Sequence, residues 1–196
     1  MYQGKFVLAI IMAKTESDRI PYKNTLMLDF CDGKSLQELA EEYVFESASS
    51  KGGYVDAKLV TGRGLDPNLS PDIADTAREV VLNECPRADI VCVIQMDHVV
   101  RRQTLNELIK IFMADPQVTE LRTVNELGRS TGAVRIYDRK ALLQEKNTNQ
   151  LSRHITVVNW GPQLDIHTQK DFETARMWYI DSVNEGKAKL EKKVEE

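Results

Sequence analysis

The chain has 196 residues, of which 42% are hydrophobic and 29% are charged, and its formal net charge is −4. These values are typical of a globular domain with a substantial core, and there is no basic excess of the kind that nucleic-acid-binding proteins carry. No apolar stretch approaches the roughly 20 residues that span a bilayer, and the first residues lack the pattern of a signal peptide, so we expect a cytoplasmic protein with neither a nucleic-acid nor a membrane partner.

The chain begins with an apolar strand that runs into a cation-rich loop. Six consecutive apolar residues at Phe6–Ile11 predict a strand buried on both faces, as in a parallel sheet. The loop that follows contains Lys14, Arg19 and Lys23. Because an open α/β sheet binds its ligand beyond the carboxyl ends of its strands, and because cations suit a polyphosphate, this loop is a candidate anion site.

Helical and extended patterns alternate along the rest of the chain. Capping residues mark two helix starts, with Ser35 and Glu38 forming a capping box and Ser70 preceding a proline. Expected helices cover 36–48, the segment from Ser70 to Pro86, 103–115, 139–144 and 169–183; expected strands cover 25–28, 54–61, 90–94, 118–124, 132–137 and 155–158. This alternation predicts an α/β fold of three layers, a mostly parallel sheet with helices on both faces. We expect one domain over 1–196, with a charged tail at 184–196 that either continues the last helix or frays.

Two further strand ends carry polar residues. The buried strand at 90–94 leads into Gln95, Asp97 and His98, and Asp97 is the best candidate for a metal ligand, because Mg²⁺ prefers carboxylate oxygens. The strand at 54–61 leads into a loop that begins Gly62-Arg63-Gly64. That loop has two interpretations, a ligand loop or a connector loosened by glycine. Cys31, Cys85 and Cys92 are odd in number and lack CxxC spacing, so they indicate neither a disulfide framework nor a zinc site.

The first loop resembles the N-terminal signature of the cytidylyltransferases that make CMP-activated acidic sugars. The sialic-acid branch of that family reads roughly P-A-R-G-G-S-K-R-I-P-x-K-N, and the 3-deoxy-manno-octulosonate branch P-A-R-Y-G-S-T-R-L-P-G-K. The residues that match both branches are Ala13, Ser17, Arg19, Pro21 and Lys23, and those that match the first alone are Ile20 and Asn24. Lys14 replaces an arginine, Thr15-Glu16 replaces a pair that contains glycine, and Asp18 replaces lysine or threonine.

Three later segments resemble the same family in the same order. Gln95-Met-Asp97 is similar to the Gln-Gly-Asp-Glu-Pro motif of the octulosonate branch, whose Asp binds the metal and whose Gln lies near the sugar. Gly132–Tyr137 resembles an Asn-Gly-Ala strand. Asp165-Ile-His167-Thr168, with Asp171-Phe172, resembles an Asp-Ile-Asp-Thr-x-x-Asp-Phe motif, with His167 in place of a metal-binding Asp. Three interpretations of His167 follow: a site retuned for Mn²⁺ or Zn²⁺, a magnesium site that uses Asp97 and Asp165, or a lost site.

The resemblance implies a Rossmann-like nucleotide-diphospho-sugar transferase fold and a cytidylyltransferase that joins CTP to an acidic keto-sugar and releases pyrophosphate. It implies Mg²⁺, with Mn²⁺ as the alternative that His167 suggests. The residues implied to bind the nucleotide are Ala13, Lys14, Ser17, Arg19, Lys23 and Asn24. The implied catalytic residues are Lys23, Arg19 and Asp97, and Gln95 is implied to contact the sugar. The implied metal ligands are Asp97, Asp165 and His167. A homodimer is a possible assembly, although only about 16 residues separate Asp115 from Gly132, so the dimerisation insert of the family is shortened or absent. Two alternatives stay open: a non-catalytic nucleotide-binding relative, and another transferase that uses nucleotide sugars on the same fold.

Overall fold

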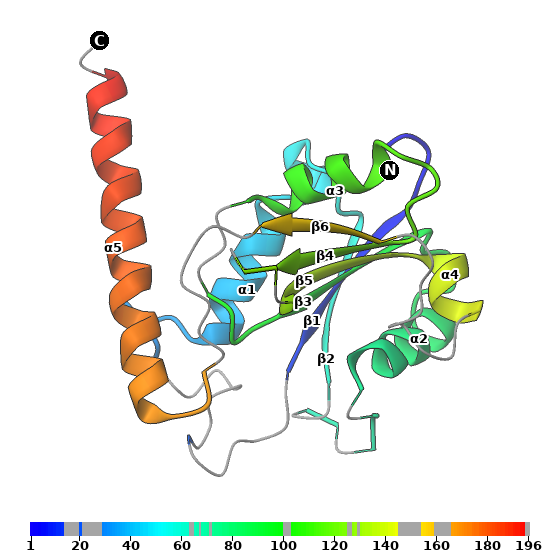
Figure 1. The fold of residues 1–196 in the computed structure, drawn as a ribbon, viewed down its shortest axis with the longest axis horizontal. Coiled ribbons are helices and arrows are strands. Elements are labelled where there is room, and N and C mark those ends of the chain that lie inside the picture. The colour runs from blue at the N-terminus through cyan, green and yellow to red at the C-terminus, as the bar shows by residue number, and fades with distance from the viewer. Residues whose placement is uncertain are drawn as a thin grey trace.

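The computed structural model describes residues 1–13, 20, 29–62, 65–66, 68–70, 72–99, 103–124, 127–128, 130–144, 154–158 and 166–194. Strands and helices alternate along them, as the sequence predicts (Figure 1). The strands are β1 Val7–Met12, β2 Ala57–Thr61, β3 Ile90–Gln95, β4 Glu120–Val124, β5 Ser130–Asp138 and β6 His154–Val158. The helices are α1 Leu36–Phe45, α2 Ile73–Asn83, α3 Leu105–Met113, α4 Arg139–Gln144 and α5 Gln169–Val194, with a short 3₁₀ turn at Ser49–Lys51. The short extended piece expected at 25–28 lies outside the described residues.

The strands form one sheet in the order β2-β1-β3-β5-β4-β6. β1 pairs in parallel with β2 and β3, and β4 pairs in parallel with β6. β5 is antiparallel to both of its neighbours, β3 and β4. Five strands therefore point the same way and one points the opposite way, which confirms the mostly parallel sheet. Because of this common direction, the carboxyl ends of β1, β2, β3, β4 and β6 lie along one edge.

Alternating side chains divide the core between the two faces of the sheet. In β1, Val7, Ala9 and Ile11 belong to one buried cluster, and the residues between them belong to the other. The first cluster contains the inward faces of α1, α3 and α5, and the second contains those of α2 and α4. Figure 1 shows α2 and α4 side by side, apart from α1 and α3. Helices thus cover both faces, and the predicted three-layer architecture is confirmed.

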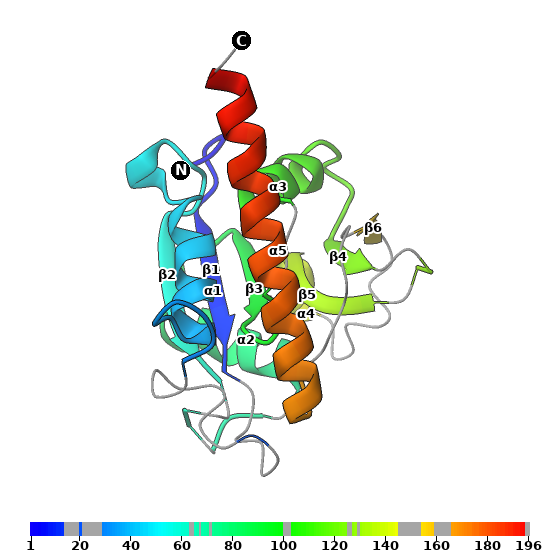
Figure 2. The same cartoon turned by 90° about the vertical axis from the view of Figure 1, so that its left-hand side faces the viewer.

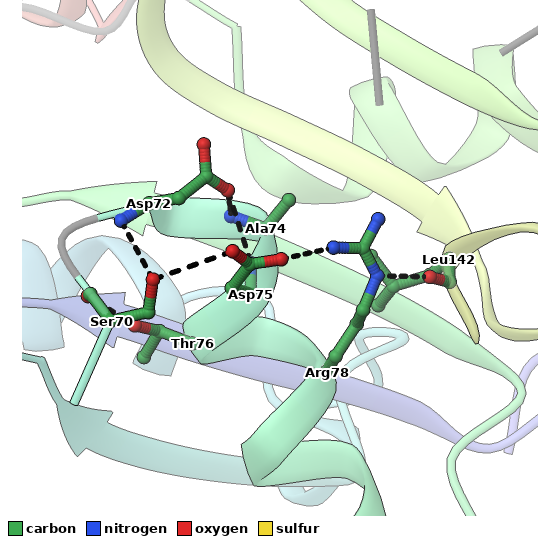
Figure 3. Close-up of polar contacts among 7 residues, drawn as sticks. All are labelled: Ser70, Asp72, Ala74, Asp75, Thr76, Arg78 and Leu142. Carbon is green, nitrogen blue, oxygen red and sulfur yellow. Dashed lines mark hydrogen bonds and ion pairs between the residues drawn. The ribbon is translucent and has the colours of Figure 1, made fainter. Parts of the chain in front are cut away.

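Helix starts follow the capping chemistry of the sequence, with one correction. The capping box of Ser35 and Glu38 at α1 is confirmed, and Thr104 with Glu107 forms a second one at α3. The predicted start of α2 at Ser70 is wrong by two residues, because Asp72 is the N-cap (Figure 3). Its carboxylate accepts hydrogen bonds from two backbone N–H groups, at 2.8 and 3.1 Å, whereas the Ser70 hydroxyl accepts one from the N–H of Asp72 itself.

The last helix is anchored at its first turns and extends past the rest of the protein. Phe172 and Ala175 are buried, and the ring of Phe30 meets Phe172 edge to face with centroids 5.1 Å apart. The helix continues through the charged tail to Val194, one of the two alternatives expected for the tail, and Figures 1 and 2 both show its C-terminal end rising clear of the other elements. Among the described residues, no helix combines the length and the apolar character that crossing a bilayer requires.

Candidate functional site

Three neighbouring strands end level with one another at the carboxyl edge of the sheet. Met12, the last residue of β1, is paired in register with Thr61 of β2 and with Gln95 of β3. The residues that follow these strands therefore start from adjacent positions: Ala13 before the cation-rich loop, Gly62 before the next loop, and Met96 and Asp97 after β3. This is the edge where the sequence predicts the ligand.

Gly62 lies directly against the backbone of Ala13. Its φ is +130°, and a Cβ placed on it would lie 2.4 Å from the carbonyl oxygen of Ala13 and 3.0 Å from its nitrogen. The N–H of Ala13 donates to the carbonyl oxygen of Thr61 at 2.7 Å, which holds the two chain segments together. Gly62 is thus required by close packing at the point where the predicted anion loop begins. A glycine at a strand end was the only signal of this contact in the sequence.

The turn after β3 is buried, in contrast to most loops at strand ends. Gln95, Asp97 and His98 are all buried, and Asp97 is only 1% exposed. Asp97 is therefore not a solvated aspartate at a strand end. Burial of a carboxylate costs free energy that hydrogen bonds, an ion pair or a metal ion must offset. The side chain of Asp97 is thus buried at the carboxyl edge of the sheet and does not lie on the surface.

Gln103 joins three elements beside this edge. Its side-chain amide donates to the carbonyl oxygen of Val158, the last residue of β6, at 2.6 Å. Its own carbonyl oxygen accepts a hydrogen bond from the hydroxyl of Tyr43 in α1 at 3.0 Å. The residue therefore ties the end of β6 and the start of α3 to α1, a role that no motif in the sequence indicated.

His167 lies on the surface, next to the cap of α5. Ile166 is buried in the core, and His167 after it is exposed. The carboxylate of Asp171 accepts hydrogen bonds from the backbone N–H groups of His167 and Thr168, at 3.2 and 2.8 Å, and the N–H of Asp171 donates to the Thr168 hydroxyl at 3.2 Å. The pKa of the Asp171 carboxyl lies below its ordinary value, chiefly because its carboxylate interacts with the Thr168 hydroxyl and also because it accepts the two backbone N–H bonds. Asp171 caps the helix and supplies a negative charge at its N-terminus.

Most of the expected phosphate and metal ligands fall on parts of the chain that the structure does not describe. They are Lys14, Ser17, Arg19, Lys23, Asn24 and Asp165. The structure places Ala13, Gln95 and Asp97 at adjacent strand ends of one edge, and His167 before α5. Within the described residues, no group of three His, Cys, Asp or Glu side chains is arranged to hold a metal ion.

A cavity of about 580 Å³ lies beside this edge, on the face covered by α1 and α5. Its lining residues are Leu39, Glu42, Tyr43, Phe45, Glu46, Lys51, Val99 and Tyr179. Glu42 and Glu46 are paired with Lys34 and Lys51, at 2.7 and 2.9 Å. Of the expected site residues that the structure describes, none lines this cavity, although Val99 lies two residues after Asp97.

Sequence comparisons find no matching family model and no matching curated protein. Comparison with solved structures finds many similar chains. A CMP:2-keto-3-deoxy-manno-octonic acid synthetase complexed with CTP is 17% identical with a TM-score of 0.62, covering 90% of this chain and 99% of its own. A 4-diphosphocytidyl-2C-methyl-D-erythritol synthase from Anaerococcus prevotii is 16% identical with a TM-score of 0.61, and the match covers 90% of this chain and 99% of the synthase. A cytidylyltransferase from Leptospira borgpetersenii is 16% identical with a TM-score of 0.58, and the match covers 95% of this chain and 96% of that enzyme. The resemblance found in the sequence is thus confirmed at the level of architecture: this chain has the Rossmann-like fold of the cytidylyltransferases.

Proposed function

We propose that this protein transfers the cytidylyl group of CTP to an acidic keto-sugar, of the sialic-acid or octulosonate kind, and releases pyrophosphate. The observation that carries the proposal is the register of β1 and β3, in which Met12 is level with Gln95. The cation-rich loop and the turn that contains Asp97 therefore start side by side. The shared fold of three cytidylyltransferases gives independent support.

Five of the predicted residues are assigned roles in this reaction. Arg19 binds the triphosphate by charge and forked hydrogen bonds and Lys23 by charge, and Gln95 contacts the sugar. Asp97 and Asp165 supply hard carboxylate oxygens of the kind that Mg²⁺ prefers, and the buried position of Asp97 at a strand end fits that donor set. A bound Mg²⁺ would neutralise charge on the triphosphate.

The chemistry itself is an in-line displacement. A sugar hydroxyl oxygen forms a bond to the α-phosphorus and loses its proton to water, while the bond from that phosphorus to the bridging oxygen of the β-phosphate breaks. The protein contributes by holding the two reactants in line and by stabilising the negative charge that builds up. The cations of the first loop face the leaving pyrophosphate in this arrangement, and Gln95 orients the acceptor.

Substitution of Asp97 tests the proposal. Asp97→Asn keeps the size of the side chain but removes its charge, so we expect at least about a 100-fold loss of pyrophosphate release, the scale of one lost electrostatic contribution to a transition state. Asp181→Asn, at an exposed position of α5, is the matched control and should keep full activity. The assay is pyrophosphate release from CTP, UTP and ATP with a panel of acidic sugars, with circular dichroism to verify folding. An active, folded Asp97→Asn enzyme would refute the assigned role.

One observation favours a second candidate, a non-catalytic nucleotide-binding protein. His167 stands where the family carries a metal-binding Asp, and the neighbouring Asp171 is engaged in capping α5. A protein of this kind would still be stabilised by CTP, since a ligand of the native state raises its melting temperature by mass action. A CTP-dependent rise in melting temperature, without pyrophosphate release for any sugar in the panel, would select this candidate.

A further inference from the structure

Two arginines lie opposite each other in the sheet, away from the carboxyl edge. Arg122 of β4 and Arg135 of β5 are antiparallel register partners, and Glu120 and Tyr137 form the next pair on the same face. Tyr137 belongs to the core cluster of α2 and α4, which identifies the face. Like charges directly opposite each other on neighbouring strands destabilise a sheet, so the pair needs a compensating anion.

The protein supplies part of that compensation through Glu120. This side chain is fully buried, and its carboxylate accepts a hydrogen bond from Nε of Arg122 at 2.6 Å. Arg135 has no such acid: among the described residues it forms no ion pair, and its Nε is buried without a hydrogen-bond partner. A buried donor without a partner costs free energy. The cluster therefore contains a guanidinium group whose charge Glu120 does not balance.

Arg139 adds a third guanidinium group. Its backbone N–H donates to the carbonyl oxygen of Asp89 at 3.0 Å, which continues the ladder between β5 and β3 by one residue. Strand alternation puts Arg135 and Tyr137 on one face, and Arg139, the first residue of α4, follows Tyr137 by two positions along the chain. Its Nε is also buried and, within the part of the chain that the structure describes, has no hydrogen-bond partner. Asp138 falls on the opposite face by the same alternation, and its carboxylate caps α4 by accepting from the N–H of Ala141 at 3.1 Å.

Tyr137 completes the cluster with a neutral donor. Burial is the main cause that raises the pKa of its phenol, the charge of Arg135 acts in the opposite direction, and Glu120 raises the pKa further. The net rise keeps the hydroxyl protonated at neutral pH. Among the described residues, the cluster thus presents three guanidinium groups and one O–H donor, with a single carboxylate, that of Glu120, beside them.

We propose that Arg122, Arg135, Arg139 and Tyr137 form a binding site for a phosphate group, either inorganic phosphate or a phosphate monoester. Three positive charges and one negative charge leave a net charge of +2, which matches the charge of about −1.5 to −2 of a phosphate monoester at pH 7. Planar guanidinium forks fit phosphate oxygens in pairs. Arg135 is level with Val93 and Tyr137 with Val91, two and four residues before Gln95, or about 7 and 13 Å along the strand. The proposal does not depend on the nucleotide site proposed above, and the controls below separate the two.

The test measures the melting temperature of the full chain in sodium phosphate, in a hexose 6-phosphate and in sodium chloride, at equal ionic strength. We expect both phosphate compounds, or the monoester alone, to stabilise the wild-type protein beyond chloride. Stabilisation by both would point to free phosphate as a sufficient ligand, and stabilisation by the monoester alone to a sugar phosphate. In Arg135→Gln the apparent affinity should fall at least about tenfold, the loss expected for one charge-assisted hydrogen bond.

Two controls separate this site from general charge effects and from the nucleotide loop. Lys140→Gln removes a positive charge from an exposed position next to Arg139 and should keep the phosphate effect. The double variant Arg19→Gln, Lys23→Gln should also keep it. If Arg135→Gln does not fold, phosphorus NMR of phosphate titrated with Arg139→Gln provides the same comparison. The proposal is overturned if phosphate stabilises no more than chloride, or if the effect survives Arg135→Gln and disappears in the double variant.

Discussion

The contact between Gly62 and Ala13 makes a quantitative prediction. In Gly62→Ala, the new methyl group would lie 2.4 Å from the Ala13 carbonyl oxygen, and the backbone would hold alanine at φ +130°. Overpacking of this kind costs about 1–3 kcal/mol, and a strained backbone conformation costs about 1–3 kcal/mol more. At about 2–4 °C per kcal/mol for a chain of this size, we expect a drop in melting temperature of the order of 10 °C.

Two other glycines separate the two contributions. Gly52 has φ +78° and no atom within 4 Å of the position that a methyl group would take, so Gly52→Ala measures backbone strain alone. A Cβ on Gly53 would lie 2.3 Å from the Ser47 carbonyl oxygen, without a positive φ, so Gly53→Ala measures the clash alone. Urea denaturation of the three variants should give the largest loss of unfolding free energy for Gly62→Ala. A loss for Gly62→Ala no larger than that for Gly52→Ala would refute the reasoning.

Two further predictions concern the cap of α5 and a core thiol. Asp171→Asn should destabilise the protein by about 0.5–2 kcal/mol at pH 7, as the loss of a cap does. Because the folded-state pKa of Asp171 is lowered, the stabilisation by its carboxylate is present above the unfolded pKa of about 3.9 and disappears as the pH falls through the folded pKa. Urea titrations of the variant and the wild type should therefore converge below about pH 4. Burial raises the pKa of the Cys92 thiol, so iodoacetamide should modify Cys85 in the native protein and Cys92 only after unfolding; mass spectrometry that finds Cys92 alkylated under native conditions would contradict this burial.

The sequence predicted the elements well where local chemistry decides them. The apolar run at the start, the capping box of Ser35 and the alternation of strands with helices all appear in the structure. The start of α2 was misplaced because Ser70 and Asp72 are both good caps, and only the folded geometry shows that the Asp72 carboxylate reaches two N–H groups. The sequence left open whether the charged tail continues the helix after Gln169, and the helix does continue to Val194, since the lysines and glutamates of the tail are good helix formers.

Tertiary features lay further beyond the reach of a single sequence. The direction of β5 could have been inferred, since the five residues 125–129 are too few for a crossover and favour an antiparallel connection. The burial of Asp97 could not have been inferred, because a strand pattern in the sequence does not show which residues cover the end of the strand. The arginine pair was equally hidden, since Arg122 and Arg135 become neighbours only through the register of β4 and β5.

The central position of β5 has a consequence for synthesis of the chain on the ribosome. β2, β1 and β3 can assemble as soon as residue 95 has emerged, but β4 is attached to them only through β5, which is made later. During that interval the backbone N–H and C=O groups of β4 have no strand beside them, and unpaired strands of this kind favour aggregation. Translation of the short segment between Val124 and Asp138 is therefore an interval in which β4 and the outer edge of β3 both lack the strand that joins them.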